Sequence, residues 1–232
     1  MSHPSRVQPE LSIIVPVLNE ADAITGQLTH LDHWRQRGAE VVIVDGGSTD
    51  QTAEIARRAD FNVITSAAGR ALQMNAGARA CHSQHLLFLH ADTRLPENAD
   101  QVLARTFNTG SPVWGRFDVI IQGSSRMLPV VATLMNWRSR LSGIATGDQA
   151  LFMTRGLFDK TGGFPEQPLM EDIEISKRLK KLCRPVCLRE KVITSGRRWD
   201  ARGSWPTIIL MWQLRWAYWR GVPVQKLAER YR

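Results

Sequence analysis

The sequence predicts an α/β fold in which a mostly parallel sheet is flanked by helices. Over the first half of the chain, short apolar runs alternate with stretches of helical pattern, which is typical of a doubly wound sheet. The runs are apolar at successive positions, as expected of strands covered on both faces. With 232 residues and 43% hydrophobic content, the chain can bury one sizeable core.

The first half of the chain accounts for most of the predicted sheet. The runs LSIIVPV, EVVIV, NVIT and HLLFL predict strands at residues 11–17, 40–44, 62–65 and 85–89. Asn19 and Glu20 open the first helix, a polar turn precedes the second, and a glycine lies near the start of the third. These patterns predict helices at residues 19–37, 51–58 and 69–81.

The second half is less regular. A long apolar run predicts a strand, an amphipathic stretch predicts a helix, and a second strand and helix follow. The predicted ranges are 113–122, 124–141, 149–154 and 171–182.

Composition limits the possible partners and locations. The formal net charge of +8 favours phosphates or an anionic membrane surface as partners. No helix-turn-helix, zinc-finger or RNA-binding signature is present, so we do not expect nucleic acid binding. Cys81, Cys183 and Cys187 have no framework spacing and are expected to be reduced thiols of a cytoplasmic protein. Residues 1–10 lack an apolar signal core, and no apolar run approaches bilayer length.

The fourth predicted strand ends in His90-Ala91-Asp92. Residues two apart on an extended chain point the same way, and ligands of open α/β sheets bind beyond the carboxyl ends of strands. An imidazole and a carboxylate placed there suit a divalent cation. The alternatives are that Asp92 caps a turn and that His90 is packed or faces solvent.

The first two strands also end in polar loops, at residues 16–20 and 45–50. Glycines there let the backbone approach a ligand closely, and the carboxylates can accept hydrogen bonds from a ribose or a base. Neither loop has the dinucleotide-binding or the Walker pattern of glycines. The alternative is a polar turn that caps the helix at 51–58.

Further motifs follow in order along the chain, and together they resemble one family. They are Pro16 to Glu20, Val44 to Asp50, Gly69 to Gly77, His90-Ala91-Asp92, Gly162-Gly163-Phe164 and Glu171-Asp172. This series is similar to the inverting glycosyltransferases of family 2, which have the GT-A fold. Within that family the chain most resembles a small soluble subgroup called transferase 2, which is associated with radical-SAM and selenium-domain genes.

The resemblance implies a nucleoside-diphosphate sugar, a UDP- or GDP-sugar, as donor. It implies that the donor is bound by Pro16, Asn19, Glu20, Asp45, Gly46, Arg70, Gln73, Ala91, Asp148 and Arg198. Asp92 and His90 would hold a divalent cation, Mn²⁺ or Mg²⁺, against the diphosphate. His90 stands where the family usually has aspartate, and imidazole suits Mn²⁺ better than Mg²⁺.

An inverting transfer needs a base that takes the proton of the acceptor hydroxyl. By the family pattern Asp172 is this base and Glu171 supports it. The start of a helix stabilises an ionised carboxylate, and adjacent carboxylates can raise one pKa. The alternative is plain capping of the helix, and Asp148 is the competing carboxylate.

Two segments near the end of the chain bear on the acceptor. Residues 195–199 resemble, in reduced form, the Gln-x-x-Arg-Trp motif of processive family members, without its glutamine. Arg197 and Arg198 would reach the diphosphate, or else form a basic surface turn. Residues 204–220 combine tryptophans with arginines, a composition that suits a membrane interface or packing on the rest of the chain or on a second copy in a homodimer.

The predicted organisation follows from these motifs. Residues 1–10 form a disordered tail, 11–203 a catalytic domain with a nucleotide-binding half (11–95) and an acceptor half (96–203), and 204–232 a C-terminal amphipathic helical segment. The predicted function is transfer of a sugar to an unknown acceptor hydroxyl with inversion, in the cytoplasm or on the inner face of the membrane. The alternatives are a nucleotidyltransferase, whose usual glycine-rich loop is missing after the first strand, and a non-catalytic nucleotide-sugar-binding protein.

Overall fold

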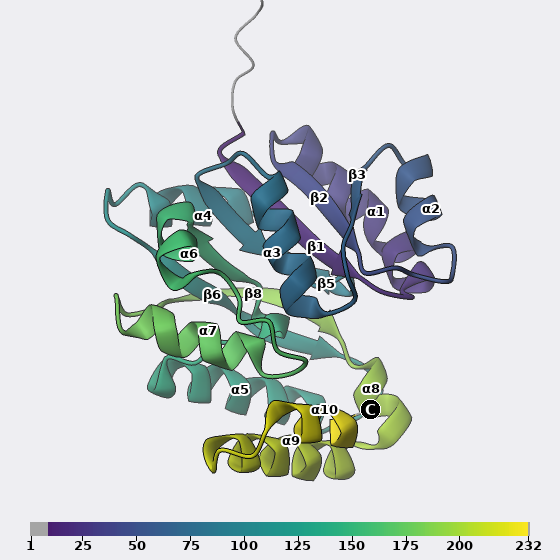
Figure 1. Ribbon diagram of the computed structural model, residues 1–232, viewed down its shortest axis with the longest axis vertical. Helices are drawn as coiled ribbons and strands as arrows, with labels where there is room; N and C mark the ends of the chain where they lie inside the picture. Colours follow the sequence, from purple (N-terminus) through teal and green to yellow (C-terminus); the bar gives the residue numbers. More distant parts are fainter. Residues whose placement is uncertain (1–8, 232) are drawn as a thin grey trace, which may run out of the picture.

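The computed structural model describes residues 9–231 (Figure 1). Most of the predicted N-terminal tail therefore lies outside the described residues. The described strands form an eight-stranded sheet in the order β3-β2-β1-β4-β7-β6-β8-β5. Helices cover both faces of this sheet, so the predicted α/β class with a mostly parallel sheet is confirmed.

The first half of the chain folds as its pattern predicts. Its elements are β1 (Leu11–Val17), α1 (Ala21–Gln36), β2 (Glu40–Asp45), α2 (Thr52–Arg58), β3 (Asn62–Thr65), α3 (Arg70–Ala80) and β4 (His85–Phe88). Strand β1 pairs in parallel with β2 and β4, and β2 pairs in parallel with β3. The carboxyl ends of these strands therefore meet at one edge of the sheet.

The second half contains elements that the apolar pattern does not predict. Its elements are β5 (Thr93–Arg94), α4 (Ala99–Phe107), β6 (Trp114–Gln122), α5 (Leu128–Ser142), the 3₁₀ turn η1 (Gly147–Gln149), β7 (Leu151–Thr154), α6 (Arg155–Thr161), α7 (Glu171–Lys180), β8 (Val186–Ser195), α8 (Arg197–Arg202), α9 (Ser204–Trp219) and α10 (Val224–Tyr231). The strand expected at 149–154 begins later, because Gln149 closes a capping box with Thr146 in the 3₁₀ turn. Elements β5, β8, α4, α6 and α8 were not predicted.

The sheet is mixed beyond β4. Strand β7 runs antiparallel to both β4 and β6, whereas β8 pairs in parallel with β6. Strand β5, which follows β4 directly in sequence, pairs antiparallel with β8 at the far edge. Segments about a hundred residues apart thus meet next to the ends of β1 and β4, as the hydrogen bond between the Thr93 and Thr194 hydroxyls shows (2.9 Å, 101 residues apart).

Two apolar layers enclose the sheet, and strand periodicity decides which side chain enters which layer. Ile13 and Val15 face the layer of α1, α4 and α5, whereas Ile14 faces the layer of α3, α6 and α7. A separate cluster joins α9 and α10 to the start of α7, with Leu214 and Leu227 fully buried. Within residues 9–231, no helix is both long and apolar enough to cross a bilayer.

Helix α3 lies very close to the sheet because it carries a glycine at the contact. A Cβ at Gly77 would lie 2.4 Å from Ile14 Cγ2 and 2.9 Å from Val44 Cγ2. Only glycine allows this approach. The contact brings the first residue of the helix, Arg70, to the edge where β1, β2 and β4 end.

Candidate functional site

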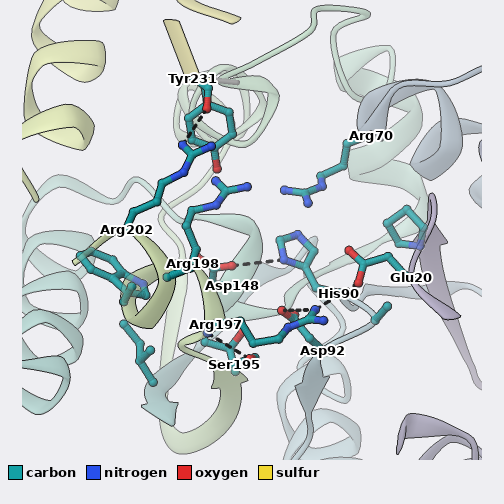
Figure 2. Close-up of a pocket in the computed structure, with 16 residues that line it drawn as sticks. Glu20, Arg70, His90, Asp92, Asp148, Ser195, Arg197, Arg198, Arg202 and Tyr231 are labelled. Carbon is teal, nitrogen blue, oxygen red and sulfur yellow. Dashed lines mark hydrogen bonds and ion pairs between the residues drawn. The ribbon is translucent and has the colours of Figure 1, made fainter. Parts of the chain in front are cut away.

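A cavity of about 450 Å³ lies at the carboxyl edge of β1 and β4 (Figure 2). Its walls come from the two strand ends, the start of α3, the η1 turn, the end of β8 and helix α8. The side chains that line it are Pro16, Glu20, Arg70, His90, Ala91, Asp92, Ile121, Asp148, Thr194, Ser195, Arg197, Arg198, Trp199, Ala201, Arg202 and Tyr231. Eight predicted donor- or metal-binding residues are therefore brought together: Pro16, Glu20, Arg70, His90, Ala91, Asp92, Asp148 and Arg198.

Arg197 joins the two carboxylates at the strand ends. Its Nη2 lies 3.1 Å from Glu20 Oε2 and 3.5 Å from Asp92 Oδ2 (Figure 2). These contacts raise the pKa of Arg197, chiefly through the hydrogen bond to Glu20. The strand ends thus hold two carboxylates close enough to share one cation.

His90 is directed away from Asp92 and toward the η1 turn. Its Nδ1 lies 3.2 Å from Asp148 Oδ1, while its buried Nε2 has no hydrogen-bond partner among the described residues. A Cβ at Gly147 would lie 2.3 Å from Nε2, so only glycine at this position leaves room for the imidazole ring. The Asp148 side chain is 48% exposed; its partial desolvation would raise its pKa, but the hydrogen bond and charge of His90, with Arg70 and Arg198, lower it.

Asp172 lies beside this cavity, on a narrow pocket that also has Arg70 and His90 in its walls. Its Oδ2 accepts the Gly147 N–H at 3.1 Å and its Oδ1 accepts the Ile173 N–H at 2.7 Å. Burial, with the neighbouring Glu171 carboxylate, raises the pKa of Asp172 to about 6 despite these two hydrogen bonds. A carboxylate with this pKa is ionised at neutral pH and basic enough to accept a proton.

Arginines make the opposite wall strongly cationic. Arg70 from α3 and Arg198 from α8 point toward one another across the cavity (Figure 2). Burial and the neighbouring charges of Arg70 and Arg202 lower the pKa of Arg198. The guanidinium of Arg198 lies 4.3 Å from the centre of the Tyr231 ring, and Arg202 Nη1 donates to the Tyr231 carbonyl oxygen at 3.2 Å. Guanidinium groups held together in this way favour a ligand with more than one negative charge, such as a diphosphate.

Four predicted donor-binding residues lie outside the lining and hold the loops together. Gln73 Nε2 donates to the carbonyl oxygens of Val17 (2.7 Å) and Val44 (2.9 Å), which ties the ends of β1 and β2. The other three are Asn19, Asp45 and Gly46: Asn19 accepts the Thr49 N–H, Asp45 accepts N–H groups of its own loop, and a Cβ at Gly46 would lie 2.9 Å from Gln73 Cδ.

The donor groups present fit a cation that takes part of its coordination from a ligand. Among residues 9–231, no group of three or more His, Cys, Asp or Glu side chains could hold a metal alone. Hard cations are often bound by one or two carboxylates together with phosphate oxygens, which suits Asp92 beside a diphosphate. The ring nitrogens of His90 face Asp148 and Gly147 instead.

The sequence gives little sign of several lining residues. Ser195 and Thr194 end β8, a strand with mixed polarity, and Tyr231 comes from α10. Arg202 lies in α8, a helix of six residues with none buried. The reduced Gln-x-x-Arg-Trp pattern at residues 195–199 was a signal for Ser195, Arg197 and Arg198, whereas Thr194, Arg202 and Tyr231 had none.

Comparison with known proteins places this geometry in a family context. The family model described as Glycosyl transferase family 2 matches residues 12–163. The chain is also 35% identical to a PGL/p-HBAD biosynthesis glycosyltransferase of Mycobacterium tuberculosis, and the match covers 38% of each protein. The chain thus aligns with well under half of the length of this curated relative.

Solved structures share the fold at low sequence identity. A mannosyltransferase of Pyrobaculum calidifontis, in complex with GDP-Man and Mn²⁺, is 21% identical with a TM-score of 0.60, over 81% of this chain and 57% of that chain. TarS of S. aureus with UDP-GlcNAc is 18% identical with a TM-score of 0.62, over 80% and 58%. Glucosyl-3-phosphoglycerate synthase of Mycobacterium tuberculosis, with Mn²⁺, UDP and glucosyl-3-phosphoglycerate, is 17% identical with a TM-score of 0.58, over 80% and 71%. The fold is therefore GT-A-like.

Proposed function

The chain belongs to glycosyltransferase family 2, and on this premise we propose that it transfers a sugar from a nucleoside-diphosphate sugar to an acceptor hydroxyl with inversion. The observation that carries the proposal is the pairing of two neighbouring environments. One is a cavity with carboxylates on one wall and arginines on the other. The other is the adjoining pocket, where Asp172 has a pKa raised to about 6.

The cavity suits the donor in its charge pattern. Carboxylates at the strand ends, Glu20 among them, can accept hydrogen bonds from ribose hydroxyls. Arg70 and Arg198 can neutralise the diphosphate and stabilise the charge that grows on it as the bond to the sugar breaks. Asp92 would hold Mn²⁺ or Mg²⁺, which when bound supplies Lewis-acid stabilisation of the departing diphosphate.

Asp172 is proposed as the base. It takes the proton of the acceptor hydroxyl while that oxygen forms a bond to the anomeric carbon and the bond to the diphosphate breaks. Attack from the face opposite the leaving group gives inversion. Glu171, buried beside Asp172, is proposed to set the basicity of Asp172 rather than to touch substrate.

The donor remains to be identified, and the structural neighbours suggest which donors to test. Since these neighbours were solved with GDP-Man and with UDP-GlcNAc, we propose to screen UDP- and GDP-sugars by thermal shift, with Mn²⁺, Mg²⁺ or no metal. We expect one nucleotide class to raise Tm, and the metal to increase the shift. If no nucleotide sugar shifts Tm under any of these conditions, the donor site is wrong.

Activity is then tested with the donor that binds. Slow hydrolysis of that donor, released as sugar and nucleoside diphosphate, is expected even without the true acceptor. A tight binder that is never hydrolysed or transferred would favour a non-catalytic sugar-nucleotide-binding protein. Release of pyrophosphate from a nucleoside triphosphate and a sugar 1-phosphate, measured in a separate assay, would indicate a nucleotidyltransferase instead. We also propose that the chain belongs to the transferase 2 subgroup and acts in the cytoplasm.

A further inference from the structure

Helix α9 exposes an apolar stripe along its whole length. Its members recur every three or four residues and therefore share one face of the helix. They are Trp205, Ile209, Trp212, Trp216 and Trp219, which are 53–78% exposed. Large aromatic side chains exposed in a continuous row are unusual on a monomer surface and mark an interaction site.

The opposite face of α9 is already occupied. Leu214 and Ala217 are buried in the cluster that joins α9 to α10 and to the start of α7, with Met170 and Ile173 in the same cluster. Helix α9 therefore already packs on the rest of the protein through its other face, and the exposed stripe is not needed for that packing.

A second stripe lies on α5. Val130, Leu134, Trp137 and Leu141 follow the same spacing and are 48–79% exposed. The two helices start from neighbouring points, since the hydroxyls of Ser125 and Ser204 lie 2.6 Å apart, and both lie at the end of the molecule remote from β3 and α2 (Figure 1). The exposed apolar surface is thus concentrated at one end.

Helix α9 itself carries only basic charges, and the carboxylates next to it in sequence are Asp200, which accepts the Ser124 and Ser125 N–H groups, and Glu229 on α10. Residues 201–228 contain four basic residues and no Asp or Glu. The basic residues are Arg202, which lines the donor cavity, and Arg215, Arg220 and Lys226. Residues 119–147, which include α5, also contain no Asp or Glu. A helix with tryptophans and arginines but no carboxylates of its own matches the surface of an anionic bilayer, where indoles lie at headgroup depth and arginines meet lipid phosphates.

We propose that the exposed stripe of α9, with its flanking basic residues, docks the protein on the surface of an anionic lipid bilayer. A second copy of the chain is the less favoured occupant, because a two-fold contact would bring the same carboxylate-free helix, with its arginines, against itself. Docking bears on the proposed transfer, since α9 follows α8 directly through Gly203 and α8 forms one wall of the donor cavity. The acceptor class it favours is a hydroxyl carried at the membrane surface, and this part rests on the proposed function.

The docking surface is tested by sedimentation of the purified chain with vesicles of phosphatidylcholine, with and without phosphatidylglycerol. Binding is expected with phosphatidylglycerol and should weaken as salt is raised. A blue shift of tryptophan fluorescence should accompany it. Equal binding to both vesicle types, or to neither, overturns the proposal.

Variants separate the two parts of the surface. Trp212→Gln with Trp219→Gln should weaken vesicle partitioning by roughly tenfold or more, since it removes two large aromatic anchors. Arg215→Gln with Arg220→Gln should weaken it by roughly thirtyfold, at about one kcal/mol for each arginine near an anionic surface. Leu182→Ser, which removes a half-exposed leucine after α7, is the matched control and should bind as the parent does.

Two measurements keep the outcome clear. Light scattering without lipid tests whether a second copy covers the stripe. If the parent is a dimer, the tryptophan variant is a monomer, and the parent does not bind vesicles, lipid docking is overturned. The donor-induced rise in Tm, measured without vesicles, should be the same in the parent and in the tryptophan variant. If the tryptophan variant loses vesicle binding but keeps the donor-induced rise in Tm, the docking proposal is supported independently of the proposed function. If neither protein shows the rise, the proposed function is contradicted and the docking proposal is not affected.

Discussion

At the scale of single residues, the site shifts the pKa values of two neighbouring carboxylates, Asp148 and Asp172, in opposite directions. Asp148 pairs with His90 and lies among arginines, so its pKa falls below the ordinary value for aspartate. Asp172 is partly buried beside the buried Glu171, and its pKa rises to about 6. Carboxylates whose environments push their pKa values apart can divide the work of a reaction. We therefore expect Asp172, the proposed base, to set the acid limb of the pH profile.

Replacement of the base tests this assignment directly. Asp172→Asn should lower the rate of transfer or donor hydrolysis by roughly 10²–10⁴-fold and leave the donor-induced Tm shift in place. Asp159→Asn, on the exposed surface of α6, should match the parent. Activity that survives in Asp172→Asn would move the role of base to another group, with Asp148 the first to examine.

The pH profile of the parent carries a second prediction. The base must be ionised, and a raised pKa means that ionisation is lost as the pH falls through about 6. Activity should therefore drop about tenfold per pH unit below that point. Glu171→Gln removes the neighbouring negative charge, so this limb should move to lower pH. Glu166→Gln, on the surface, should leave the pH of the acid limb unchanged. If Glu171→Gln has the same acid limb as the parent, the role proposed for Glu171 is wrong.

Part of the site was predictable at this scale. Asp92, Glu20 and Arg70 come from short motifs at strand ends or a helix start, and local sequence is enough to place such residues at one edge of a parallel sheet. The direction of the His90 ring was not predictable, because it depends on Gly147 and Asp148, which arrive from a turn far along the chain. The hydrogen bonds of Gln73 to two strand ends likewise depend on how closely α3 approaches the sheet.

At the scale of elements, the position of α3 decides where Arg70 lies. Gly77 lets the helix rest against β1 and β2, and an added methyl group would overlap Ile14 and Val44. Gly77→Ala should therefore destabilise the fold by about 1–3 kcal/mol, which lowers Tm by roughly 2–4 °C per kcal/mol. Chemical denaturation measures the free energy of unfolding in the same variant.

Gly26 provides the matched comparison. It lies within α1, where an added Cβ meets no atom within 4 Å. Alanine is favoured over glycine in a helix by up to about 1 kcal/mol, so Gly26→Ala should be neutral or stabilising. Equal losses in the two variants would mean that helix propensity, rather than the contact with Ile14, dominates at Gly77.

The elements that could not be predicted share a physical reason. Strand β8 buries only Val192 and Thr194 and therefore shows no apolar run, and β5 has two residues. Both exist because they pair with partners far away in sequence. By contrast, β1, β2 and β4 are buried on both faces, so their apolar composition alone predicts them.

At the scale of the whole molecule, one sheet runs through the two predicted halves of the catalytic domain. Strand β4 pairs with β7, and β5 pairs with β8, across the proposed boundary at residue 95. We therefore expect calorimetry to show one cooperative transition for the sheet, with the van't Hoff and calorimetric enthalpies in agreement. A bound donor should move that whole transition. Two transitions, one of which alone responds to the donor, would show that residues 11–95 unfold separately.

The pairing of β5 with β8 also sets the moment in synthesis at which the pocket can first exist. The carboxylates at the ends of β1 and β4 leave the ribosome early, but Thr93 must wait for Thr194 before its strand has a partner. Arg197, the ion-pair partner of both carboxylates, follows directly. A nascent chain therefore carries Glu20 and Asp92 without this partner until about a hundred residues beyond Asp92 have been made.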